Sequence, residues 1–101
     1  MPTLYEYFGL LIFFYSDEHL PIHVHGKYHE RESKAEILVR NGEVWRITFS
    51  NIKGKPPLAG KKLAEFKLLV ELKANDIVRR WTDYFVFHRH IQREIITRRL
   101  K

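Results

Sequence analysis

The amino-acid sequence predicts an α+β domain: an antiparallel sheet of four to five strands with two helices packed on one face. Asn41-Gly42 joins two stretches of alternating apolar and polar residues, and this dipeptide is a strong local signal for a β-hairpin turn. Residues 61–85 instead place apolar side chains every three or four positions, which is typical of amphipathic helices. Strands followed by helices in this order favour an α+β architecture.

The predicted strands lie in the first half of the chain. The best supported are residues 10–15, 22–28, 35–39 and 45–49, and a short strand at 4–8 is weaker. In 22–28 the side chains of Ile22, Val24 and Tyr28 alternate with those of His23, His25 and Lys27. Because successive strand residues point to opposite faces, the alternation predicts an apolar face and a histidine-bearing face.

The second half of the chain is predicted to be mainly helical. Residues 51–60 contain Pro56-Pro57 and form the connector. We expect one helix over 61–73 and a second that starts at a cap on Asn75 or Asp76 and runs to Phe85. Residues 91–100 include a β-branched stretch and are read as a last strand. The core between sheet and helices is predicted to contain Trp45, Phe49, Phe66, Trp81 and Phe85.

Length and composition indicate a single domain over residues 1–101, with a sheet half (1–50), the connector (51–60) and a helical half (61–101). A chain of 101 residues, 45% of them hydrophobic, can bury roughly two-thirds of its unfolded surface. The absence of cysteine excludes disulfides, thiolate zinc sites and cysteine nucleophiles. The start of the chain does not resemble a signal peptide, and its longest apolar run is too short to cross a bilayer. We therefore expect a cytoplasmic protein with no membrane partner.

Charge is unevenly distributed along the chain. Residues 1–50 hold five Lys/Arg and seven Asp/Glu, whereas residues 51–101 hold thirteen and five. A basic half attracts phosphate backbones or an acidic protein partner, although it can also be a solvated surface. The residues predicted to contact phosphate or a partner, RNA or DNA included, are Arg79, Arg80, Arg89, Arg93, Arg98 and Arg99.

His19, His23 and His25 form the one cluster with chemical character. Imidazole is a common zinc ligand, so the three side chains are a candidate site for a divalent metal, with His29 or Glu30 as a fourth ligand. The same three residues are candidate catalytic groups for RNA cleavage, because imidazole exchanges protons near neutral pH. Lys27 on the same face would steady phosphate charge. Against both stands the simpler interpretation of an inert surface pair.

A family resemblance rests on three segments: Met1-Pro2-Thr3, Ile12–Tyr15, and Asp17–His25 followed by Tyr28. They resemble a bacterial family known only as a domain of unknown function, numbered 4160. Its usual pattern is an acidic residue, His, a spacer, Pro-Pro, His, an apolar residue and His; this chain has Ile22 in place of the second Pro. The resemblance is strongest over residues 1–50.

The resemblance implies little about chemistry. Members are often encoded beside another small domain, in arrangements that look like toxin–antitoxin pairs. A shared family site would fall on His19, His23 and His25. Those histidines could equally be structural, with His19 capping the loop and His23 bonding a backbone carbonyl.

Three functions follow from these observations, and the sequence leaves open whether the protein is an enzyme. The first is a small basic component of a toxin–antitoxin-like module, which binds a cognate antitoxin-like protein or nucleic acid. The second is a histidine-dependent RNase toxin. The third is a small metal-binding protein that uses the histidine cluster.

Overall fold

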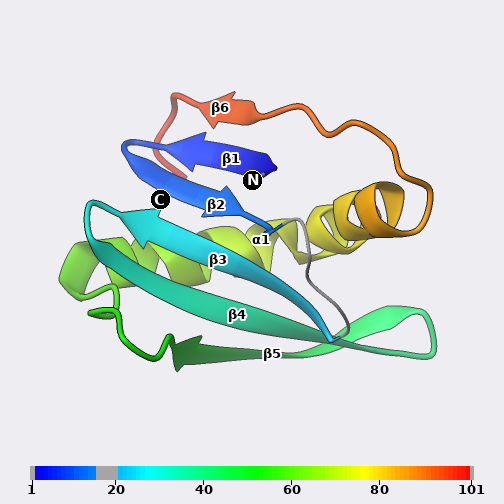
Figure 1. The fold of residues 1–101 in the computed structure, drawn as a ribbon, viewed down its shortest axis with the longest axis horizontal. Helices are drawn as coiled ribbons and strands as arrows, with labels where there is room; N and C mark the ends of the chain where they lie inside the picture. The colour runs from blue at the N-terminus through cyan, green and yellow to red at the C-terminus, as the bar shows by residue number, and fades with distance from the viewer. Residues whose placement is uncertain (1, 16–20, 101) are drawn as a thin grey trace.

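A computed structural model describes residues 2–15 and 21–100 and shows one α-helix against a six-stranded mixed sheet (Figure 1). The strands are β1 (Thr3–Tyr7), β2 (Leu10–Phe13), β3 (Ile22–Tyr28), β4 (Arg31–Arg40), β5 (Glu43–Asn51) and β6 (Glu94–Ile96), and the helix α1 is Gly60–Phe85. Their order across the sheet is β5-β4-β3-β2-β1-β6. All neighbours are antiparallel except β1 and β6, which are parallel.

The α+β class is confirmed, but the prediction of two helices is wrong. α1 runs without a break for 26 residues, and Asp76 lies inside it rather than at a cap. Its buried apolar side chains continue in one stripe at helical spacing across the expected break: Phe66, Leu69, Val70, Ala74, Ile77 and Trp81. Packing of this stripe on the sheet outweighs the weak helix propensity of Asn75 and Asp76.

The sheet also departs from the prediction of four to five antiparallel strands. The strand predicted over residues 91–100 is only Glu94–Ile96, and it adds to β1 in parallel. β4 begins at Arg31, earlier than the predicted residue 35, because His29 and Glu30 form a tight turn after β3. The predicted turn at Asn41-Gly42 is confirmed, with φ of 54° and 81° at the two residues, as a type I′ turn requires.

The core lies between α1 and one face of the sheet. Gly26 marks the closest approach: a Cβ atom there would lie 2.4 Å from the ring of the fully buried Phe66. Gly26 and Val24 therefore face α1, and His23 and His25 belong to the opposite face, which we call the outer face. Phe66, Trp81, Phe49 and Phe85 contribute to the core as predicted, the last two partly buried.

Trp45 does not. It is 53% exposed, contrary to the prediction that it packs beneath the helix. The pairing of β4 with β5 shifts from Leu38–Arg46 to Val39–Val44, so Trp45 is the extra residue of a β-bulge. Val44 packs against the core next to it, and the bulge leaves Trp45 in solvent.

No helix in the described part of the chain combines the length and the apolar character that crossing a membrane requires.

Candidate functional site

The outer face carries a polar cluster built around a buried carboxylate. Glu32 is 1% exposed, although it lies on the sheet face away from α1. Its Oε1 accepts a hydrogen bond from Lys55 Nζ at 2.8 Å, and its Oε2 accepts one from the Tyr15 hydroxyl at 3.0 Å. His25 Nδ1 lies 3.1 Å from the same Oε2. We call Tyr15, His23, His25, Glu32 and Lys55 the outer-face cluster.

The register of β3 against β4 brings the carboxylate of Glu32 next to the imidazole of His25. β3 and β4 pair Lys27 with Glu32 and His25 with Lys34, so Glu32 and His25 are diagonal neighbours on one face. His25 is only 6% exposed because its ring stacks on Phe13 at 5.5 Å and meets Tyr15 edge-on at 4.5 Å. The sheet thus holds His25 in a fixed place beside a carboxylate.

His23 lies next to His25, as the two-residue period of the strand predicts. The ring centroids are 5.5 Å apart, and His23 is the more exposed of the two. His23 Nδ1 lies 2.8 Å from the carbonyl oxygen of Pro21. A carbonyl only accepts, so Nδ1 carries the proton and the neutral ring has Nε2 as its basic nitrogen. The backbone-carbonyl bond expected of a structural His23 is therefore present.

The connector after β5 supplies the cation of the cluster. The backbone N–H of Glu32 donates to the carbonyl of Pro56 at 2.9 Å, and Leu58 N–H donates to Ser33 Oγ at 3.0 Å. These bonds fix residues 55–58 against the start of β4 and place Lys55 over Glu32. The hydrogen bond to Glu32, with a second to Tyr15, raises the pKa of Lys55, which stays a cation at neutral pH.

Tyr15 stays a neutral donor in the same cluster. Desolvation raises its pKa, the hydrogen bond from Lys55 opposes this effect, and the neighbouring Glu32 raises the pKa further. Glu32, Tyr15 and Lys55 were not predicted as site residues. The signal that could have found Glu32 is the His29-Glu30 turn, which sets the register that places Glu32 beside His25.

The predicted metal site finds no support among the described residues. His19 lies outside them, and within residues 2–15 and 21–100 no group of three or more His, Asp or Glu side chains is placed to hold a metal ion. His29 and Glu30, offered as a fourth ligand, form the turn between β3 and β4. Of the predicted ligands, the structure therefore brings together His23 and His25.

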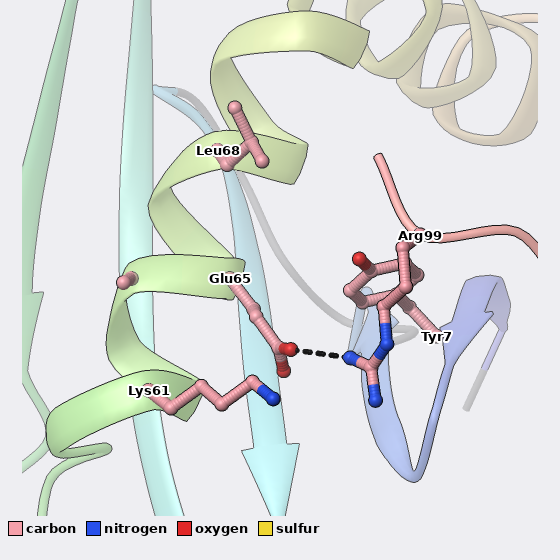
Figure 2. Close-up of a pocket in the computed structure, with 6 residues that line it drawn as sticks. Tyr7, Lys61, Glu65, Leu68 and Arg99 are labelled. Carbon is pink, nitrogen blue, oxygen red and sulfur yellow. Dashed lines mark hydrogen bonds and ion pairs between the residues drawn. The ribbon is translucent and has the colours of Figure 1, made fainter. Parts of the chain in front are cut away.

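Most of the predicted phosphate-contacting arginines make ion pairs within the domain. Arg79 and Arg80 pair with Asp76, Arg89 with Asp83, and Arg93 with Glu6. Figure 2 shows Arg99 directed at Glu65, 2.7 Å away, beside a pocket of about 360 Å³ between α1 and the chain after β6. In the described ranges only Arg98 of this set makes no ion pair. The pairs of Arg89 and Arg93 are exposed and therefore weak, and phosphate contact by this set of arginines stays a prediction.

Comparison with known families matches residues 9–82 to a domain of unknown function (DUF4160), and the chain belongs to this family. The matched range contains β2 to β5, most of α1 and the whole outer-face cluster. It ends before Arg89, Arg93, Arg98 and Arg99. No curated protein and no solved structure is significantly similar to the chain.

Proposed function

We propose that this member of the DUF4160 family is a histidine-dependent endoribonuclease, with His23 and His25 as its acid–base pair. One observation carries the proposal: two imidazole rings lie 5.5 Å apart on one side of β3, and one of them is held against a buried carboxylate. Pairs of titratable groups in different environments are a common basis for general acid–base catalysis.

The environments of the two rings suggest separate roles. His23 is the more exposed ring, and its Nδ1 lies against the Pro21 carbonyl, so we assign it as the base that removes the proton from an RNA 2′-hydroxyl. Nδ1 of His25 lies 3.1 Å from Oε2 of Glu32, and we assign His25 as the acid that protonates the departing 5′-oxygen. The 2′-oxygen bonds to phosphorus as the P–O5′ bond breaks, which yields a 2′,3′-cyclic phosphate and a 5′-hydroxyl.

Positive charge near the imidazoles would favour the phosphate in this reaction. Lys55 keeps its charge, and 42% of its side chain is exposed. Lys27 is exposed on the same face by strand alternation. Cations placed near the phosphorus atom under attack stabilise the negative charge that develops on its oxygens in the transition state.

The proposal includes the toxin–antitoxin-like setting. An endoribonuclease made alone should slow the growth of its host, and a cognate antitoxin-like protein that covers the outer face should restore growth. Expression of the wild type and of His23→Ala from the same promoter compares the two directly, with soluble protein level as the control. Equal growth of the two strains at equal protein level would count against a ribonuclease toxin.

The direct test is cleavage of an end-labelled single-stranded RNA by the purified protein. We expect products with a cyclic phosphate, a loss of about 10²-fold or more in rate for His23→Ala, and full activity for the exposed control His90→Ala. A DNA strand of the same sequence should stay intact because it lacks the 2′-hydroxyl.

Two outcomes would reassign the function. If the wild type binds RNA without cutting it, the domain is a binding component of the module. If a chelator abolishes cleavage, the metal hypothesis for the histidines replaces the acid–base mechanism, which consumes no water and needs no metal.

A further inference from the structure

The β-bulge of β5 leaves the ring of Trp45 largely in solvent. Trp45 is 53% exposed, while Val44 and Ile47 on either side of it pack against the core. An exposed tryptophan forfeits a large burial gain, and exposed aromatic rings combined with positive charge are typical of single-stranded nucleic-acid sites. The β4–β5 turn lies at one corner of the sheet (Figure 1), so Trp45 is accessible to a large partner.

Two arginine guanidinium groups lie over this ring as cation–π contacts. The guanidinium carbons of Arg40 and Arg46 lie 5.1 Å and 4.9 Å from the centre of the Trp45 ring. Within the described residues neither makes an ion pair, in contrast to five of the six arginines predicted to contact phosphate. Their positive charge is therefore available to an anion that approaches the ring.

We propose that Trp45, Arg40 and Arg46 bind single-stranded nucleic acid, with a base that displaces a guanidinium group from one face of the indole and with the adjacent phosphates held by the two arginines. Base–aromatic stacking accepts any base, and arginines neutralise phosphates without reading sequence. A single strand fits because its base faces are accessible, whereas those of a duplex are covered. An acidic protein would engage the arginines alone and leave the exposed indole unused.

The proposed stacking site lies close to the outer-face cluster across β4. β4 pairs Glu36 with both His23 and Thr48, and Arg46 is two residues from Thr48 on the same face. Two strand spacings across and two residues along separate the backbones of Arg46 and His23 by about 12 Å. A few nucleotides span this distance, so the stacking site would position RNA for cleavage. Only this positioning role rests on the proposed function.

The experiment is a fluorescence titration with a 12-nucleotide oligodeoxythymidine, which has no 2′-hydroxyl and so cannot be cleaved by the proposed reaction. Trp81→Phe leaves Trp45 as the only tryptophan. We expect quenching of its emission and a log–log salt dependence with a slope of about −1.4, or about 0.7 for each of two phosphates. If Trp81→Phe does not fold, the difference between wild type and Trp45→Phe gives the same readout.

Variants then assign the binding to these residues. Trp45→Ala should weaken binding by about tenfold or more, and Arg40→Gln or Arg46→Gln should each lower the slope by about 0.7. The matched control is Phe87→Ala, because Phe87 is an equally exposed ring beside Arg89, whose charge is paired with Asp83. This control should bind like the wild type.

Three results would overturn the proposal: no quenching at low salt, binding by Trp45→Ala equal to that of the wild type, or equal affinity for a poly-glutamate peptide. The third would identify a surface for an acidic protein. Oligodeoxythymidine binding by a protein that does not cleave RNA would refute only the proposed ribonuclease. RNA cleavage without this binding would refute only the stacking site.

Discussion

Two carboxylates of this domain, Asp76 and Glu32, have similar hydrogen-bond partners but lie in clusters with different chemical properties. Asp76 accepts hydrogen bonds from the Tyr5 hydroxyl and from Arg80, and Glu32 accepts them from the Tyr15 hydroxyl and from Lys55. Asp76 also accepts a hydrogen bond from Arg79, whereas Glu32 lies 3.1 Å from Nδ1 of His25. Both clusters join elements far apart in the chain, but only the Glu32 cluster contains a group suited to proton transfer.

Tyr5, Asp76, Arg79 and Arg80 form the Asp76 cluster, which we call the clamp because it ties β1 and the segment before β6 to α1. Arg80 bonds Asp76 in α1 and the carbonyl of Gln92 ahead of β6, while Tyr5 ties β1 to the same carboxylate. Burial tends to raise the pKa of Asp76, but the hydrogen bonds from Tyr5, Arg80 and Arg79 outweigh it and lower that pKa. Burial, followed by the bond to Asp76, strongly raises the pKa of Tyr5. At neutral pH Asp76 is therefore ionised and Tyr5 is neutral.

The comparison teaches that a buried carboxylate alone does not mark a functional site. Asp76 has a structural role, since its lowered pKa keeps the carboxylate ionised at neutral pH and bonded to its partners. A carboxylate that orients a histidine beside a second histidine can support acid–base chemistry. Mutations of Asp76 and of His23 should therefore separate stability from activity.

The largest stability loss should come from the clamp. Asp76→Asn should lower the free energy of unfolding by about 2–3 kcal/mol, because it removes charged hydrogen bonds to Tyr5 and Arg80 at a site only 25% exposed. Urea melts at neutral pH measure this loss, and RNA binding and cleavage should persist at temperatures where the variant is folded.

Acidification sharpens that test. A lowered folded pKa stabilises the protein above the unfolded pKa of about 3.9, and this contribution disappears as the pH falls below that value. The gap between wild type and Asp76→Asn should therefore narrow below about pH 4. A gap that is constant from pH 7 to pH 3 would show that the ionised carboxylate is not what stabilises the clamp.

An intermediate effect is expected for His25. His25→Ala should destabilise the domain by about 1–3 kcal/mol, because it removes a buried ring that stacks on Phe13 and leaves Glu32 with one partner fewer. Thermal and urea melts measure this loss, and RNA cleavage should fall with it. The sequence alone predicts a change below about 0.5 kcal/mol for histidines on an exposed face and about 1–3 kcal/mol for each structural histidine; the burial of His25 favours the larger figure.

The smallest stability effect should come from His23. His23→Ala removes a partly exposed ring and should change stability by less than about 0.5 kcal/mol. Loss of RNA cleavage in a variant this stable would place His23 in the catalytic machinery. A stability loss above about 1 kcal/mol would assign it a structural role.

Local patterns in the sequence predicted part of this structure well. The two-residue alternation correctly bounds β3 at Ile22–Tyr28 and places His23 and His25 on one side of it. Asn41-Gly42 correctly marks the turn between β4 and β5. These features depend on backbone conformation and side-chain period, which are local properties of the chain.

The sequence-based predictions failed where contacts between segments far apart in the chain determine the local structure. Asn75 and Asp76 resemble a helix cap, but α1 continues through them because the core offers one uninterrupted surface for its apolar stripe. Trp45 fits the inward alternation of β5, but a bulge opposite Val39 gives that place to Val44. The arginines form a basic block in the sequence, yet the fold sets acidic residues from β1 and α1 against most of them.

By itself, the sequence determined the α+β class, most of the strands and the family, because alternation, turn chemistry and short motifs are written in neighbouring residues. Only the tertiary structure decided which polar groups share a site. Glu32 joins His25 through hairpin register, and Lys55 joins both through a connector bonded to β4. The physical reason is that hydrogen bonds and ion pairs act over a few ångströms in space, whatever the separation of their residues along the chain.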